Sequence, residues 1–195
     1  MRKIDVTLVA GARPQLLRAM LTSFVWALES RGDVASVWVN IDPFLGTEHD
    51  QALCREMTLE LFPNAQVSQP SKASFGAAVR RLWTQCGENP TLHLEDDWIF
   101  EQKLDLGVLV EFERNEKLGA LKLSHKHEVR HAEINGVSIS RPRKRRMEFD
   151  VWGLMRIKLW RVNGFGTSPR FIKGGLAKKL GCLIDPSMDP EKQVY

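Results

Sequence analysis

The chain has 195 residues, 43% hydrophobic and 27% charged, so it can form a packed core and is not a disordered segment. It has no apolar run of the roughly 18 residues that a membrane span needs and no secretory signal pattern, so we expect one soluble, cytoplasmic domain over residues 1–195. Three widely spaced cysteines, Cys54, Cys86 and Cys182, form neither a disulfide framework nor a metal knuckle, and we expect them to be reduced thiols.

Charge is distributed unevenly along the sequence. Residues 1–140 contain 15 Lys and Arg against 19 Asp and Glu, a balance of −4, whereas residues 141–195 contain 13 against 5, a balance of +8. The densest basic stretch contains Arg141, Arg143, Lys144, Arg145 and Arg146. Such a stretch predicts either a solvated loop or a surface that binds a polyanion such as DNA, and both interpretations stay open.

The first 95 residues alternate between short apolar segments and segments with helical apolar spacing. Predicted strands cover residues 4–9, 34–41, 65–68 and 91–94, and predicted helices cover residues 14–30, 47–61 and 74–86. Strands that alternate with helices in this way predict parallel units with right-handed crossovers. The expected fold class is therefore α/β, with a mostly parallel central sheet flanked by helices.

The pattern becomes mixed and irregular beyond Trp98. It predicts a helix over residues 104–115, a strand over 119–123, extended segments over 128–152 and a helix over 168–180. Ser168 and Pro169 have the residue types of an N-cap and a first-turn proline, which is why the last helix is expected to begin there. We expect this more irregular part to belong to the same domain.

Three consecutive acids, Glu95, Asp96 and Asp97, follow the fourth predicted strand. Adjacent carboxylates repel one another and resist burial unless a cation or hydrogen-bond donors compensate. Mg²⁺ and Mn²⁺ bind one or two such carboxylates and complete their shells with water and phosphate oxygens. The triplet therefore predicts a metal site, and the alternative is that it only caps the strand.

The order of these segments resembles the GT-A glycosyltransferases of the broad family-2 type. Residues 6–18, with Gly11 and Arg13 between a strand and a helix, resemble the entry of that fold. Residues 94–98 stand where an Asp-x-Asp-type motif closes the fourth strand and holds Mn²⁺ or Mg²⁺ against the sugar-nucleotide diphosphate. Their Glu-Asp-Asp-Trp form resembles a subgroup of small bacterial and phage-type members. Residues 74–81 resemble the glycine-containing helix start that lies beside the diphosphate.

This resemblance implies a single Rossmann-like GT-A domain in which residues 1–100 bind the nucleotide sugar and residues 101–195 face the acceptor. The implied donor-site residues are Ala10, Ala12, Arg13, Asp42, Arg80, Arg81, Glu95 and Asp96, with Asp97 as the metal ligand. An inverting enzyme also needs a carboxylate base, for which Glu191 and Asp189 are the candidates, whereas a retaining enzyme needs none. The end of the second predicted strand departs from the family's pattern, because Asp42 is followed by Pro43 where the family has an Asp-Asp-Gly-Ser type of turn.

The function implied by the resemblance is metal-dependent transfer of a sugar, of the hexosyltransferase type, from a nucleotide-diphosphate sugar to an acceptor hydroxyl. A UDP-sugar is the expected donor, with Mn²⁺ or Mg²⁺ as the cofactor. The basic stretch fits a hydroxymethylated base in phage DNA as acceptor, in which case the protein works in the host cytoplasm. A lipid-linked or cell-surface glycan is the other acceptor considered. The alternatives to sugar transfer are a non-catalytic nucleic-acid-binding module and a nucleotidyltransferase.

Overall fold

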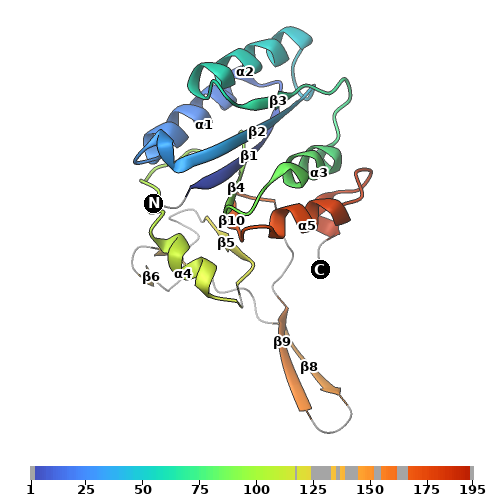
Figure 1. The fold of residues 1–195 in the computed structure, drawn as a ribbon. Coiled ribbons are helices and arrows are strands. Elements are labelled where there is room, and N and C mark those ends of the chain that lie inside the picture. The colour runs from blue at the N-terminus through green and yellow to red at the C-terminus, as the bar shows by residue number, and fades with distance from the viewer. Residues whose placement is uncertain are drawn as a thin grey trace.

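Strand β1 (Ile4–Gly11) is buried along its whole length, which explains why its sequence is almost continuously apolar. It lies inside a six-stranded sheet in the computed structural model (Figure 1). The structure describes residues 3–116, 118–123, 133–134, 137–138, 145–151, 155–161 and 167–193, with side chains for residues 3–116, 118–123 and 167–193.

The front half confirms the predicted alternation of strands and helices. After β1 come α1 (Pro14–Ala27), β2 (Val34–Asp42), α2 (Glu48–Leu61), β3 (Gln66–Ser68), α3 (Phe75–Gln85) and β4 (Thr91–Glu95), with a short 3₁₀ helix, η1 (Arg31–Asp33), before β2. Pro14 occupies the first turn of α1, and Thr47 and Asp50 form a reciprocal capping box at the start of α2. These local signals explain where the two helices begin.

The described residues of the back half form short strands and two short helices. They are α4 (Val108–Arg114), β5 (Ala120–Lys122), β6 (Glu133–Ile134), β7 (Val137–Ser138), β8 (Arg145–Val151), β9 (Met155–Arg161), β10 (Arg170–Ile172), α5 (Leu176–Leu183) and a 3₁₀ helix, η2 (Pro190–Lys192). Strands β6 and β7 pair with each other, as do β8 and β9, each pair antiparallel. In the described part of the chain, no helix combines the length and apolarity of a membrane span.

The helix predicted over residues 168–180 is wrong in its first half. Residues 170–172 form β10, which pairs antiparallel with β4 on one side and with β5 on the other. Gly175 then adopts a left-handed conformation with φ of 71°, which a helix interior does not accommodate, and α5 begins directly after it. Pairing with two strands distant in sequence outweighs the local helix signal here.

The sheet has the strand order β3-β2-β1-β4-β10-β5. Strands β1 to β4 are parallel, with Gly11 beside Asp42 and Val9 beside Glu95. Helices α1 and α2 cover one face and α3 and α5 the other (Figure 1). The carboxyl ends of β1, β2 and β4 therefore meet at one edge, where open α/β sheets bind ligands.

Each face of the sheet packs against its own hydrophobic cluster. Leu8 of β1 and Phe24 of α1 belong to the first, and Val9 of β1 and Trp83 of α3 belong to the second. Trp83 is fully buried. The three cysteines are free thiols, with Cys54 and Cys86 buried and Cys182 exposed.

Candidate active site at the carboxyl ends of the strands

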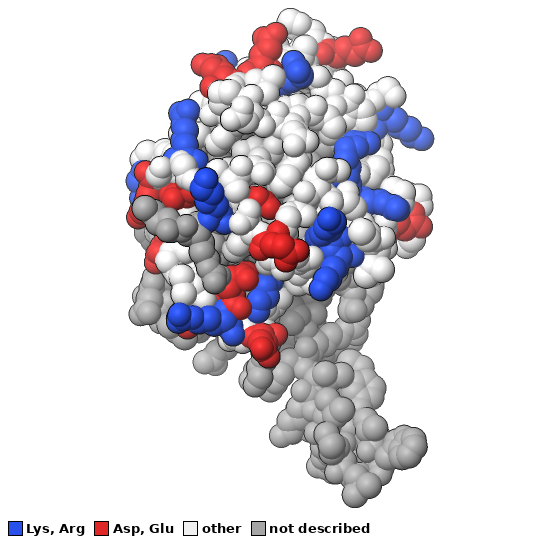
Figure 2. Space-filling view, in the orientation of Figure 1, with Lys and Arg blue, Asp and Glu red and all other residues white. Residues whose placement is uncertain are grey.

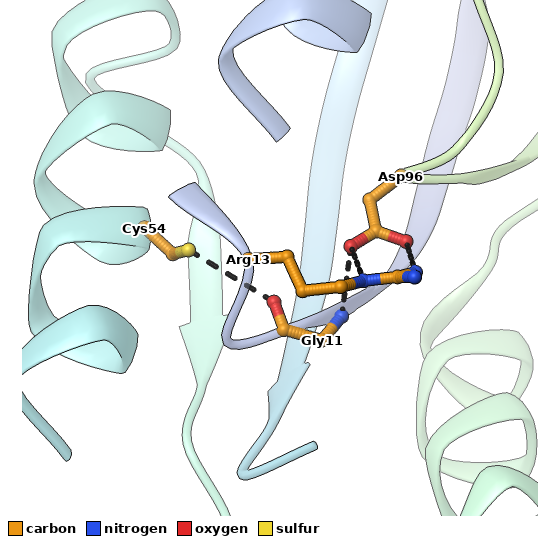
Figure 3. A network of polar contacts seen from close by, with 4 residues as sticks. All are labelled: Gly11, Arg13, Cys54 and Asp96. Atoms are coloured by element: carbon orange, nitrogen blue, oxygen red, sulfur yellow. Dashed lines mark hydrogen bonds and ion pairs between the residues drawn. The ribbon is translucent and has the colours of Figure 1, made fainter. Parts of the chain in front are cut away.

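Asp96 joins the end of β4 to the turn that follows β1 (Figure 3). Its Oδ2 accepts hydrogen bonds from the backbone N–H of Gly11 at 3.0 Å and from Nε of Arg13 at 3.2 Å, and its Oδ1 pairs with Nη2 of Arg13. The side chain of Asp96 is only 3% exposed. Burial raises the pKa of Asp96, while the bonds from Arg13 and Gly11 act in the opposite direction. Both carboxylate oxygens are therefore engaged in holding the turn.

The loop after β2 closes over the same turn. The backbone N–H of Ala12 donates to the carbonyl of Phe44 at 3.0 Å, and the guanidinium of Arg13 lies 5.9 Å from the centre of the Phe44 ring. Arg13 is thus held between a carboxylate and an aromatic ring. Ala10 packs in the core behind this turn, and Ala12 is buried within it.

Asp42 connects the end of β2 to the start of α3. Its Oδ1 accepts a bond from Nδ2 of Asn40 at 2.7 Å, and its Oδ2 accepts one from the backbone N–H of Ser74 at 3.1 Å. Oδ1 of Asn40 in turn accepts hydrogen bonds from Nη1 of Arg81 and, at 2.9 Å, from Oγ of Ser68. Of the two predicted arginines, the structure thus brings Arg81 to the Asp42 network.

Arg80 contacts instead the residue that follows α5, directly before residues 185–193, which we call the C-terminal strap. Nη1 of Arg80 donates to the carbonyl of Ile184, directly before the strap, at 3.1 Å, and Oγ of Ser74 donates to the carbonyl of Pro186 at 2.9 Å. The side chain of Gln193 closes the strap on itself by donating to the carbonyls of Asp185 and Met188 at 2.9 and 3.0 Å. The strap is therefore docked on the first turns of α3.

Gly76 is the residue of α3 that lets the strap approach. A Cβ at this position would lie 2.3 Å from the carbonyl oxygen of Met188 and about 3 Å from those of Pro186 and Asp185. We expect Gly76→Ala to destabilise the protein by about 1–3 kcal/mol through overpacking, although alanine is otherwise the better helix former. Thermal or urea unfolding measures this loss. Gly87→Ala is the matched control, because its Cβ would meet Oδ2 of Asp5 at 3.6 Å, an ordinary contact; equal losses in the two variants would contradict the close approach.

The strap brings Glu191 to the end of β4 through Thr167. Oε1 of Glu191 accepts hydrogen bonds from the backbone N–H of Thr167 at 2.7 Å and from its Oγ1 at 2.9 Å, and the same Oγ1 lies 3.0 Å from Oε1 of Glu95. Asp189 has a different position. Its Oδ1 accepts the backbone N–H of Glu191 at the start of η2, and its Oδ2 pairs with Lys192 at 3.4 Å. Of the two candidate bases, Glu191 is the one connected to Glu95.

Burial and nearby charge set the electrostatics of this carboxylate pair. The pKa of Glu95 is raised first by burial and also by the charges of Asp97 and Glu191, while hydrogen bonds from Thr167 and Trp98 act to lower it. Burial lowers the pKa of Arg170, and its attraction to Glu191 and Glu95 opposes that shift. The guanidinium of Arg170, on β10, thus supplies positive charge that offsets the negative charge of Glu95 and Glu191. In Figure 2, acidic side chains lie near the middle of the molecular surface shown, and Lys and Arg side chains lie on either side of them.

Asp97 is exposed, in contrast to its buried neighbour Asp96. No cluster of three or more His, Cys, Asp or Glu side chains suited to a metal ion occurs among the described residues. A hard divalent cation that takes one or two carboxylates and completes its shell with water and phosphate oxygens does not require such a cluster. The exposed carboxylate of Asp97, just after the end of β4, fits an ion of this kind.

Thr167 and Arg170 are site residues that the sequence analysis missed, because Arg170 lay inside the predicted helix and Thr167 directly preceded it. Asn40 and Ser68, which complete the Asp42 network, carry no recognisable signal in the sequence. The basic stretch lies outside the described side chains. Of its members, Arg145 and Arg146 begin β8, and Arg141, Arg143 and Lys144 lie outside the described residues.

Comparisons with known proteins find similarity at the level of structure. No family model matches the chain, and no curated protein is significantly similar to it in sequence. The structure is similar to that of S. aureus TarS 1-349, with a TM-score of 0.61 and 17% identity over 98% of this chain and 53% of that one. It is also similar to mannosyltransferase PcManGT from Pyrobaculum calidifontis in complex with GDP-Man and Mn²⁺, with a TM-score of 0.52 and 13% identity over 65% of this chain and 36% of that one. The chain thus has the GT-A fold and spans about a third to a half of the length of these neighbours.

Proposed function

We propose that the protein is a metal-dependent glycosyltransferase that moves a sugar from a nucleotide-diphosphate sugar to an acceptor hydroxyl. The observation that carries the proposal is the exposed residue Asp97, which directly follows the Asp96 that binds the β1–α1 turn, at the carboxyl edge of a GT-A sheet. The structural neighbour PcManGT, which was solved with GDP-Man and Mn²⁺, supports a donor and a cofactor of these classes.

The nucleotide would bind along the ends of β1 and β2. Asp42 would accept a hydrogen bond from the base or ribose, and the network with Asn40 and Ser74 holds its carboxylate in place for that task. Arg13, whose side chain is 25% exposed, would meet a phosphate with its delocalised positive charge. Arg81 would contribute a further positive charge near the end of β2.

Asp97 would hold Mn²⁺ or Mg²⁺, with Glu95 close by. When bound, the ion would supply positive charge that neutralises the diphosphate leaving group. Asp96 has a different task in this proposal, because its two oxygens fix the turn on which Arg13 lies. The three consecutive acids would thus have three separate roles, with Asp96 supporting the site from within the protein.

Glu191 would act as the general base of an inverting reaction. The transition state at the anomeric carbon would be oxocarbenium-like, by analogy with glycoside hydrolysis, and the acceptor hydroxyl must lose its proton as it attacks. Glu191 is exposed on η2, so a carboxylate oxygen is accessible to an acceptor at the surface. A retaining reaction would leave Glu191 without this role.

The acceptor part of the proposal rests on charge. The +8 balance of residues 141–195 favours a polyanionic acceptor, of which hydroxymethylated phage DNA is the specific case. A hexose from a UDP-sugar is the donor we would test first. If the protein binds duplex DNA with an affinity that falls steeply as salt is added, the result would support DNA as the acceptor. If it does not bind DNA even at low salt, DNA would be excluded as the acceptor.

A thermal-shift panel of UDP, GDP, CDP and their sugars, each with and without Mn²⁺, tests the donor class. A ligand at about 100 times its Kd stabilises the fold by about 2.7 kcal/mol, which for a chain of this size raises the Tm by roughly 5–10 °C. We expect one nucleotide to give such a shift in the presence of the metal. Stabilisation by a nucleoside triphosphate, with release of pyrophosphate, would indicate a nucleotidyltransferase instead. No shift with any nucleotide would favour a nucleic-acid-binding module.

A further inference from the structure

Thr167 occupies a junction between three parts of the chain that are distant in sequence. It lies three residues before Arg170, where β10 begins to pair with β4. Its hydroxyl lies between Glu95 and Glu191, and its backbone N–H donates to Glu191. The residue is 1% exposed, so water does not readily replace these contacts. A buried hydroxyl with two carboxylate partners is an arrangement that a folding role alone does not require.

The two hydrogen bonds to Glu191 meet at one oxygen atom. The N–H and the hydroxyl of Thr167 reach the same Oε1, at 2.7 and 2.9 Å, which restrains both the position and the rotation of that carboxylate. The hydroxyl has a single proton, so it donates to either Glu95 or Glu191 at any moment. Asp97, Trp98 and Arg170 also act on Glu95, and Arg170 acts on Glu191.

The strap that bears Glu191 is fixed independently at its other end. Ser74 and Gly76 hold the strap at Pro186 and Met188, and Gln193 ties it to itself. Glu191 itself lies on an exposed 3₁₀ turn, where a glutamate side chain is ordinarily free to move. The contact with Thr167 is therefore what distinguishes Glu191 from the other exposed acids of the strap.

We propose that Thr167 is a positioning residue that holds the carboxylate of Glu191 beside Glu95, and so makes a side chain of the C-terminal strap part of the active site. This inference rests on the proposed function. In the reaction, the O–H bond of the acceptor breaks and its proton passes to Glu191 as the acceptor oxygen bonds to the anomeric carbon. The bond from that carbon to the diphosphate breaks, and its electron pair leaves with the diphosphate. Thr167 keeps the proton-accepting carboxylate in line for this step.

Thr167→Val and Thr167→Ser form a matched pair that tests the proposal. Valine keeps the shape and the backbone N–H but removes the hydroxyl, whereas serine retains the hydroxyl. We expect Thr167→Val to lower kcat by about tenfold to a hundredfold with little change in KM for the donor, because the loss falls on the chemical step. Thr167→Ser should keep most of kcat. Lys192→Ala, an exposed change on the same strap, should leave kcat unchanged.

Amide hydrogen exchange provides a readout that does not depend on catalysis. In Glu191→Gln and Glu191→Ala, the exchange rate of the Thr167 amide should rise most in the alanine variant, because alanine removes the acceptor of that N–H. In Thr167→Val, the strap amides of Lys192 and Gln193 should exchange at least several-fold faster than in Thr167→Ser. Unchanged exchange in these variants, or equal kcat values for valine and serine, would overturn the positioning role. Absence of nucleotide binding in the unmodified protein would instead overturn the transferase function, while the exchange data would still decide whether Thr167 holds Glu191.

Discussion

Asp97→Ala is expected to abolish metal-dependent sugar transfer while leaving the protein folded. The carboxylate is exposed and would hold the divalent ion that neutralises the diphosphate. Loss of several kcal/mol of transition-state stabilisation, taken as about 4 kcal/mol, lowers kcat/KM by roughly a thousandfold. Steady-state kinetics at saturating Mn²⁺, together with the thermal shift given by the nucleotide with and without metal, measure the effect.

The stability of this variant provides the control. The charge of Asp97 raises the pKa of Glu95, so its removal relieves a repulsion and should change the free energy of unfolding by less than about 0.5 kcal/mol. Asp97→Asn keeps the size of the side chain and should show the same loss of metal dependence. Retention of metal-dependent turnover in both variants would contradict the assignment of Asp97 as the metal ligand.

Asp96→Ala is expected to destabilise the protein by about 2–3 kcal/mol. It removes the acceptor of the Gly11 N–H and the charge that pairs with Arg13. A buried donor without a partner costs about 1–3 kcal/mol, and breaking a buried ion pair costs more. Because Arg13 is 25% exposed, water recovers part of that loss. Urea unfolding measures the change, and the corresponding fall in Tm is roughly 5–10 °C.

Asp96→Asn is the matched variant for this measurement. It retains one carbonyl oxygen for Gly11 or Arg13 but replaces the other oxygen by an amide donor, so we expect a loss of about half that of alanine. The neighbouring Asp97→Ala should show almost no loss. If the two alanine variants were equally stable, Asp96 would not have the supporting role that its hydrogen bonds indicate.

These two neighbours differ because the end of β4 turns from the interior to the surface. Leu94 is fully buried, Asp96 is enclosed by the β1–α1 turn and Asp97 is exposed. A run of three acids identifies the place where the strand ends and where cations are favoured. The division of roles within the run depends on Gly11 and Arg13, which are more than 80 residues away along the chain.

Much of the front half could be predicted from the sequence because its signals are local. Apolar spacing marks α1 and α3, the capping residues Thr47 and Asp50 mark the start of α2, and a short, mostly apolar run marks β1. A chain that alternates such elements has few ways to bury all of its apolar faces, and one of them is a parallel sheet between two layers of helices. That topology also predicts that the site of chemistry lies at the carboxyl ends of the parallel strands.

The tertiary structure decided the parts that depend on distant contacts. Residues 170–172 form a strand because β4 and β5 supply partners on both sides, although Ser168 and Pro169 favour a helix locally. Glu191 reaches Glu95 only because Gly76 admits the strap and because Thr167 binds Glu191 across 24 residues and Glu95 across 72. The sequence by itself therefore determined the α/β architecture and the edge of the sheet that bears the acids, since these follow from local periodicity. Packing between segments that are distant in sequence decided which acid supports the fold and which side chains surround Glu95. Nothing in the local sequence of one such segment indicates which other segment it contacts.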